Sequence, residues 1–209
     1  EGGIVSRLKS DIPRMPGPMA LAAAASNGDH SPVYRASRAM GLQLRAAGIN
    51  MNFAPVLDVN NNPKNPVIGI RSFGEDPSLV ADLGVTAIEG FISAGIIPVG
   101  KHFPGHGNTS VDSHLALPVL SQSIAELESC ELVPFKAAIQ ANAPAVMSAH
   151  IIFQAIDPQN PATLSRAVIS DLLRGTLGFK GLAVTDCLEM NAISRYVGTA
   201  AGALSAFKA

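Results

Sequence analysis

The sequence predicts an α/β fold of the (β/α)8 TIM-type barrel class, present as an incomplete fragment that lacks strands at both ends. Three observations carry this prediction. Short, almost continuously apolar stretches alternate with longer stretches of helical period, and each apolar stretch ends in polar or ionisable residues. This alternation is typical of a parallel sheet covered by helices. No G-x-G-x-x-G or Walker loop follows any strand, which disfavours a doubly wound nucleotide-binding sheet.

The expected helices are bounded by proline near their starts and glycine near their ends. Pro32 and Pro77 suit a first helical turn, and Gly48 and Gly95 suit a helix end. A capping-box spacing of serine and glutamate opens the third helix. The four helices are expected over residues 31–48, 77–95, 121–142 and 165–178.

The expected strands end on one polar edge. They cover residues 49–59, 96–103, 144–152 and 181–186. Near their ends lie Asp58, His102, His150 and Asp186. In a barrel, the carboxyl ends of all strands meet on the face that carries the active site. Four strands cannot close such a barrel, so we expect the others to lie beyond both ends of the chain.

Composition excludes several functional classes. Of 209 residues, 47% are hydrophobic and 15% are charged, against about 25% charged in an average soluble protein. The net charge is -1 and no run of Lys or Arg occurs, so nucleic acid is not an expected partner. No apolar stretch approaches the roughly 20 residues of a membrane span, so no membrane partner is expected. Two cysteines, Cys130 and Cys187, do not make a disulfide framework.

The richest chemistry lies in residues 101–114, which hold three of the five histidines. One interpretation is a divalent metal site formed by His102, His106, Asp112 and His114, although no recognised metal-binding spacing supports it. In the second, Asp112 orients and charge-stabilises His114 for acid/base catalysis. The third is a solvated loop with incidental histidines.

A second candidate is Asp186, which closes an apolar strand. A lone carboxylate is costly there unless it binds something or is functional, and the alternative is a helix N-cap. The neighbouring Cys187 is expected to be a small packing residue.

Lys101 and His102 lie side by side at a strand end and could bind hydroxyls or anions. The alternatives are a surface charge and a satisfied buried imidazole. For Arg71 the local alternative is a salt bridge to Glu75 or Asp76.

The segments KHFPGHGNTSVDSH (101–114) and VTDCLEM (184–190) resemble the family 3 glycoside hydrolases, and more narrowly their β-N-acetylglucosaminidase branch. The resemblance extends through EGGIVSRL, NFAPVLDV, RSFGEDP, PAVMSAHI, PATLS and GFKGLAVTD. It implies that residues 1–209 are the middle part of one (β/α)8-type catalytic domain. A sugar-holding aspartate of the family would lie ahead of Glu1.

The resemblance also implies a retaining double displacement without a metal or organic cofactor. An imidazole can serve as acid and then as base near neutral pH, because its reference pKa is about 6.5. The implied nucleophile is Asp186, the acid/base residue is His114 held by Asp112, and the sugar-binding residues are Arg7, Arg71, Lys101 and His102.

The implied substrate is a small carbohydrate with a terminal β-linked GlcNAc, from cell-wall muropeptides or chitooligosaccharides. The chain has no Trp and two Tyr, which favours a short exo-type pocket over a long aromatic cleft. Alternatives are a β-glucosidase or β-xylosidase, a GlcNAc phosphorylase, a metal-dependent hydrolase and a degenerate sugar-binding barrel. Oligomeric state is not indicated, and we favour a cytoplasmic over a secreted location.

Overall fold

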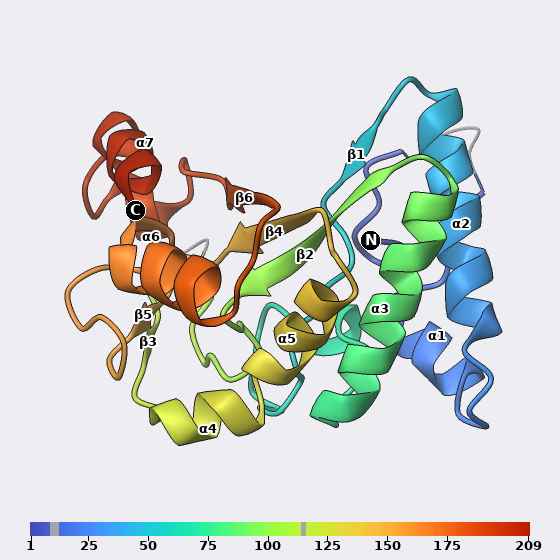
Figure 1. Cartoon of the computed structure of the whole chain (residues 1–209), viewed down its shortest axis with the longest axis horizontal. Coiled ribbons are helices and arrows are strands. Elements are labelled where there is room, and N and C mark those ends of the chain that lie inside the picture. The colour runs from blue at the N-terminus through green and yellow to red at the C-terminus, as the bar shows by residue number, and fades with distance from the viewer. Residues whose placement is uncertain (9–12, 114–115) are drawn as a thin grey trace.

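A four-stranded parallel sheet forms the centre of the computed structural model, which describes residues 1–8, 13–113 and 116–209 (Figure 1). The strands are Met51–Asn52 (β1), Ile97–Phe103 (β2), Ala145–Ser148 (β4) and Leu182–Thr185 (β6). Their order, β1-β2-β4-β6, follows the chain without reversal. A doubly wound sheet reverses at a switch point, so this order confirms the predicted TIM-barrel-like class. The four described strands form an open sheet.

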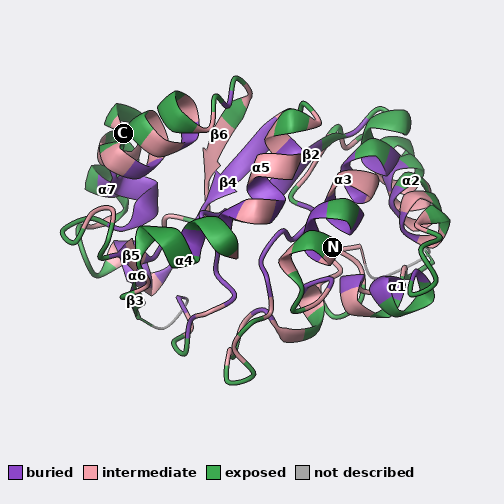
Figure 2. Ribbon diagram, turned by 60° about the horizontal axis from the view of Figure 1, so that its bottom comes forward, coloured by how far each residue is buried: buried purple, intermediate pink, exposed green. Residues whose placement is uncertain are grey.

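Helices connect successive strands. Between β1 and β2 runs Pro77–Ser93 (α3), between β2 and β4 runs Leu132–Gln140 (α5), and between β4 and β6 runs a π-helix, Ala167–Thr176 (η3). Of these, α3 and α5 pack against each other. Figure 2 shows β2 and β4 buried at the centre and exposed outer faces on the helices around them. The helical elements are Pro18–Ala24 (α1), Ser31–Ala46 (α2), Gly69–Arg71 (η1), Pro77–Ser93 (α3), Ile124–Ser129 (α4), Leu132–Gln140 (α5), Ala162–Leu164 (η2), Ala167–Thr176 (η3), Asn191–Ser194 (α6) and Thr199–Lys208 (α7).

The strand expected over residues 49–59 is regular only at Met51–Asn52. Beyond it the backbone still follows β2, because the N–H groups of Val99 and Lys101 donate to the carbonyls of Ala54 and Pro55. Pro55 has no N–H to donate in return, and beyond it the pairing with β2 continues only as an isolated bridge between Val56 and Lys101.

The helix expected over residues 121–142 is two helices, α4 and α5, separated at Cys130 and Glu131. Pro134 explains the break. It has no N–H for the carbonyl of Cys130, four residues earlier, and its ring would clash with that carbonyl in a continuous helix. The expected capping box is present at Ser123 and Glu126.

A short parallel pair that the sequence did not indicate lies away from the main sheet. It consists of Val119–Leu120 (β3) and Ile152–Phe153 (β5). These strands follow the loop after β2 and the end of β4, respectively.

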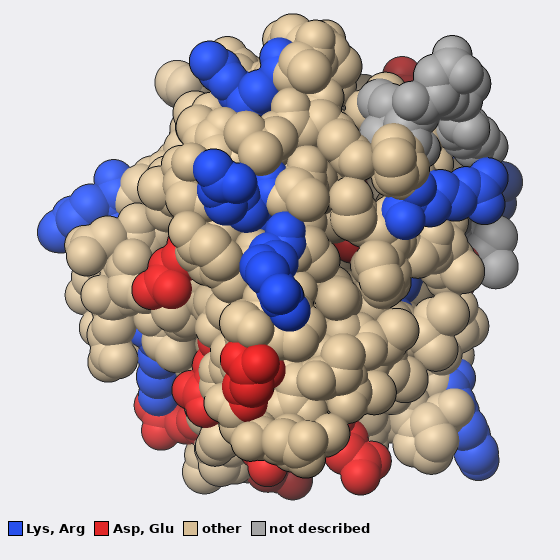
Figure 3. All heavy atoms as spheres, turned by 90° about the vertical axis from the view of Figure 1, so that its right-hand side faces the viewer, with Lys and Arg blue, Asp and Glu red and all other residues tan. Residues whose placement is uncertain are grey.

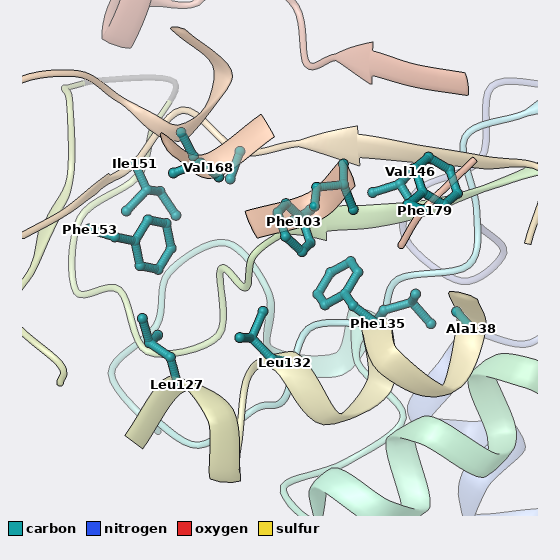
Figure 4. Close-up of a cluster of buried hydrophobic side chains, with 14 of the residues drawn as sticks. Phe103, Leu127, Leu132, Phe135, Ala138, Val146, Ile151, Phe153, Val168 and Phe179 are labelled. Carbon is teal, nitrogen blue, oxygen red and sulfur yellow. The ribbon is translucent and has the colours of Figure 1, made fainter. Parts of the chain in front are cut away.

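The largest hydrophobic cluster lies between the sheet and α5 (Figure 4). Phe103 at the end of β2 meets Phe135 of α5 edge to face, with ring centroids 5.3 Å apart. Both rings are fully buried, as are Leu127 and Phe153. This packing fixes the end of β2, the strand that carries the richest cluster of polar residues.

The surface over α2 carries its Lys and Arg side chains in small, separate groups (Figure 3). Tan surface separates these groups, and the Asp and Glu side chains gather mostly toward the lower part of that view. In the part of the chain that the structure describes, none of the helices is long and apolar enough to cross a membrane.

Candidate active site

A cavity of about 940 Å³ lies at the carboxyl end of the sheet. Parallel strands that end at one edge bring residues distant in sequence together there. The last residues of β2, the loop after it and the residue after β6 all line this cavity, as the sequence predicted. The lining includes Arg7, Arg71, Lys101, His102, Ser113 and Asp186.

The end of β2 carries a β-bulge that explains how two consecutive residues line the same cavity. Lys101 is paired with Met147 of β4, whereas Phe103 is paired with the next residue, Ser148. Regular alternation would send Lys101 and His102 to opposite faces, and a bulge redirects a side chain. Both residues are buried, at 7% and 5% exposure, so the surface-charge alternative for Lys101 is wrong.

Asp58, fully buried after the β1 segment, holds His102 in place. Its Oδ2 lies 2.7 Å from His102 Nδ1, and its Oδ1 accepts the backbone N–H groups of His102 and His106 at 3.0 and 2.8 Å. Burial acts to raise the pKa of Asp58, but the charge and hydrogen bonds of His102 outweigh it and hold the pKa below its usual range. An ionised carboxylate therefore orients the imidazole in the cavity wall.

Glu1 joins two of the predicted sugar-binding residues. Its carboxylate accepts two hydrogen bonds from Arg71, at 2.7 and 2.8 Å, and forms an ion pair with Lys101 Nζ. Although burial opposes ionisation, these cations lower the pKa of Glu1 to about 2. Arg71 and Lys101 are thus held by a buried anion.

The local salt bridge considered for Arg71, to Glu75 or Asp76, is wrong. Besides its bonds to Glu1, the Arg71 guanidinium donates to the carbonyl of Val67 at 3.0 Å, which directs it inward. Asp76 instead caps α3 by accepting the N–H groups at the start of that helix.

Asp186 directly follows β6 and is partly buried in the cavity wall. Its Oδ1 accepts the N–H of Cys187 at 2.7 Å. Burial raises the pKa of Asp186, but His102, this N–H group, His150 and Lys101 together hold it below the usual value. The carboxylate is therefore ionised at neutral pH, as a nucleophile requires.

The alternative role of Asp186 as a helix cap is wrong, because α6 begins at Asn191 and is preceded by Met190. Cys187 is exposed, so the expectation that it is a small packing residue is also wrong. Its carbonyl lies 3.0 Å from Nε2 of His150, whose Nδ1 lies 2.8 Å from the Thr163 hydroxyl. His150 therefore secures the backbone just after Asp186.

The loop after β2 brings Ser113 to the same cavity. Ser113 is buried, and its Oγ lies 3.0 Å from Nε2 of His106. Asp112 is partly buried, and its carbonyl accepts the N–H of Ala116. The predicted acid/base residue, His114, lies outside the described residues, so its pairing with Asp112 stays a prediction.

The remaining predicted residue, Arg7, is exposed at the edge of the cavity. Within residues 1–8, 13–113 and 116–209, no three His, Cys, Asp or Glu side chains group as metal ligands. His106, one member of the metal set considered, contacts hydroxyls with both ring nitrogens: Thr109 at Nδ1 and Ser113 at Nε2, each at 3.0 Å.

Sequence reasoning assigned no catalytic or sugar-binding role to three members of the site, Glu1, Asp58 and His106, although it placed Asp58 among the strand ends that meet there. Asp58 was noticeable as a carboxylate closing the apolar stretch NFAPVLDV, the same signal that marked Asp186. His106 was considered only as a metal ligand or an incidental histidine. Nothing in the sequence around Glu1 indicated its ion pairs, because both partners are at least 70 residues away.

Comparison with known proteins adds to this geometry. Residues 1–209 match the family model for the "Glycosyl hydrolase family 3 N terminal domain". The whole chain is 37% identical to Beta-hexosaminidase A of Pseudoalteromonas piscicida and covers 37% of that protein.

Two solved structures are similar over the whole chain. One is a glycoside hydrolase family 3 beta-N-acetylglucosaminidase from Paenibacillus sp. str. FPU-7, at 53% identity and a TM-score of 0.96, of which this chain covers 39%. The other is NagZ from Neisseria gonorrhoeae in complex with N-trifluoroacetyl-D-glucosamine, at 34% identity and a TM-score of 0.90, of which it covers 61%. The chain thus spans between 37% and 61% of the length of these relatives.

Proposed function

The chain belongs to glycosyl hydrolase family 3, and on that premise we propose that it forms part of the catalytic barrel domain of a β-N-acetylhexosaminidase. The enzyme removes terminal, non-reducing β-linked GlcNAc from small glycosides, such as muropeptide or chitooligosaccharide fragments. One observation carries the proposal: an ionised Asp186 shares a cavity with Lys101, His102, Arg71 and Arg7. Cleavage of a terminal sugar requires such a nucleophile and side chains that bind the sugar hydroxyls, together with a proton donor for the leaving oxygen.

In the first step, the Asp186 carboxylate attacks the anomeric carbon of the bound GlcNAc. The bond from that carbon to the leaving oxygen breaks, and the leaving oxygen takes a proton from the imidazolium of His114. A covalent glycosyl-enzyme ester results. The N–H of Cys187 and the strand end of β6 hold the carboxylate in one orientation for this attack.

In the second step, neutral His114 accepts a proton from water while the water oxygen attacks the same carbon. The ester bond to Asp186 breaks, GlcNAc leaves with retained configuration, and His114 is again protonated. Asp112 stabilises the imidazolium in both steps.

The basic side chains that line the cavity bind sugar hydroxyls. Lys101 and His102 are buried and fixed by Glu1 and Asp58, so they are preorganised and lose little freedom on binding. NagZ, a relative of this chain, has been crystallised with an N-acylated glucosamine, which supports a terminal GlcNAc as the ligand.

The test compares aryl β-glycosides of GlcNAc, glucose and xylose with the complete protein. We expect turnover of the GlcNAc substrate with retained configuration, detected by proton NMR of the released sugar. Asp186→Asn should lower kcat/KM by about 10⁴-fold or more. Asp82→Asn makes the same chemical change at an exposed position of α3 and should leave kcat/KM unchanged.

Other outcomes would contradict parts of the proposal. Preference for glucose or xylose would assign the site to the other branch of the family. Formation of GlcNAc-1-phosphate when phosphate is added would make the enzyme a phosphorylase. Sugar binding without turnover would leave a binding protein, and full activity of Asp186→Asn would reject Asp186 as the nucleophile.

A further inference from the structure

The loop that follows β2 folds back on its own first part. His106, three residues after the end of β2, is 2% exposed, and its imidazole lies against that of His102 with ring centroids 5.6 Å apart. Its backbone N–H donates to Asp58 Oδ1, so its position is set by the same carboxylate that orients His102. The start of the loop is therefore part of the rigid end of the sheet.

Both ring nitrogens of His106 contact hydroxyl groups further along the loop. Nδ1 lies 3.0 Å from Thr109 Oγ1, and Nε2 lies 3.0 Å from Ser113 Oγ. Burial, and secondarily the charge of His102, lower the pKa of His106 to about 4. The ring is thus neutral between pH 5 and 8, and either neutral tautomer satisfies both hydroxyls.

Two asparagines from the loop after Asp58 hold the stretch between these contacts. The side-chain amide of Asn65 donates to the carbonyls of His106 and Gly107, each at 2.8 Å. The amide of Asn62 donates to the carbonyls of Asn108 and Thr109 at 3.2 and 3.3 Å.

Beyond these residues the loop becomes exposed, and Val111 is 42% exposed. Ser113 is then buried again, at 2% exposure, where its hydroxyl contacts His106. That bond joins the far side of the loop to the sheet end.

We propose that His106 is a positioning residue that, through Ser113, holds the end of this loop at the cavity that Asp186 also lines, and so sets the efficiency of acid catalysis. The inference rests on the proposed function, because it assigns His106 a task in proton transfer to the leaving group. Ser113 lines the cavity that holds Asp186 and directly follows Asp112 in the chain. A displacement of a catalytic group by about 1 Å can cost about 100-fold in rate. One buried hydrogen bond at Ser113 is therefore enough to set the efficiency of acid catalysis.

The experiment measures kcat/KM of the complete protein on two GlcNAc glycosides. Cleavage of the phenyl glycoside needs protonation of the leaving oxygen. The 2,4-dinitrophenyl glycoside does not need it, because 2,4-dinitrophenolate leaves readily as the anion. Ser113→Ala should lower kcat/KM about 10- to 100-fold on the phenyl substrate and less than about threefold on the dinitrophenyl substrate. The matched control is Ser129→Ala, an exposed serine whose hydroxyl bonds within α4, and it should leave both values unchanged.

Two changes at His106 complete the test. His106→Leu removes both ring nitrogens and should reproduce the selective loss of Ser113→Ala. His106→Gln keeps a polar group near the place of Nε2 and should retain more of the phenyl activity. If His106→Leu does not fold, as judged by thermal unfolding, Ser113→Ala still decides the question.

The outcomes separate the inference from the function on which it rests. If Ser113→Ala lowers kcat/KM equally on both substrates, the role of Ser113 is merely structural and the inference is overturned. The same follows if Ser113→Ala matches Ser129→Ala on the phenyl substrate. If the unaltered protein cleaves neither glycoside, the proposed function itself fails.

Discussion

The two parts of the candidate site are held by different forces. The strand-end part consists of Asp58, Lys101, His102 and Asp186, with Glu1 and Arg71 packed against them, and it depends on buried charges. The loop part, residues 104–113, begins on the Asp58 carboxylate, which accepts the N–H of His106, and beyond that bond amide, hydroxyl and imidazole groups without net charge hold it. The stabilisation from a buried ion pair depends on pH, and removing one partner is strongly destabilising because it leaves the other charge buried and unpaired. The stabilisation from neutral hydrogen bonds depends mainly on their geometry. The two parts should therefore be separable by pH and by substitution.

The largest effect is expected where the loop part touches the polypeptide backbone directly. A Cβ built on Gly107 would lie 1.6 Å from the carbonyl oxygen of Val59. Because a backbone atom cannot move aside cheaply, Gly107→Ala should lower the free energy of unfolding by about 4 kcal/mol or more, or prevent folding. Urea unfolding of the variant measures this loss.

The control is Gly175→Ala in η3, where the nearest atom to the added Cβ is the Ser170 carbonyl oxygen at 3.4 Å. A helical Gly→Ala change of this kind should stabilise the protein by about 0.5 kcal/mol or leave it unchanged. A loss for Gly107→Ala no larger than about 1 kcal/mol would mean that the loop does not pass so close to Val59.

The next effect tests the charges of the strand-end part. The pKa of Glu1 falls from 4.5 to about 2 in the folded protein, a difference that corresponds to about 3 kcal/mol. Because the folded-state pKa is the lower one, this stabilisation is present above pH 4.5 and is lost as pH falls toward 2. In Glu1→Gln that contribution is absent, so unfolding free energy should depend less steeply on pH between about 5 and 2.

Glu75→Gln provides the comparison, since Glu75 is exposed. Denaturant unfolding of both variants and the unaltered protein at several pH values in this range gives the slope of unfolding free energy against pH for each. Identical slopes for Glu1→Gln and the unaltered protein would contradict the buried ion pairs of Glu1.

The sequence alone predicted those features of the fold and site that depend on hydrophobic periodicity and on the residues at strand ends. It predicted the α/β barrel class, the helices α2 and α3, and the convergence of Lys101, His102 and Asp186 on one cavity. The match of residues 1–209 confirms the family resemblance that its motifs indicated.

What the sequence could not give depends on contacts between distant residues. The bulge at the end of β2 is a property of pairing with β4, and the partners of Arg71 and His102 lie 70 and 44 residues away. A local rule therefore assigned Arg71 the nearest carboxylates, and these were the wrong ones. The roles of Asp112 and His114 stay predictions from the motif.

The smallest of the three effects concerns Asn65, which joins the loop part to the segment that leads to Arg71. Its amide nitrogen donates to the carbonyls of His106 and Gly107, and its Oδ1 accepts the N–H groups of Val67 and Ile68. Asn65→Asp keeps the shape and the acceptor, but sets a carboxylate oxygen against two carbonyl oxygens. We expect a loss of about 2 kcal/mol in unfolding free energy.

Because an aspartate is ionised throughout pH 6–8, this loss should not change over that range, in contrast to the acid sensitivity conferred by Glu1. Asn142→Asp, at an exposed position, controls for the added charge. Urea unfolding at pH 6, 7 and 8 gives the comparison. Equal stability of the two variants would show that the loop part does not depend on the Asn65 amide. It would contradict the view that neutral hydrogen bonds hold the loop part.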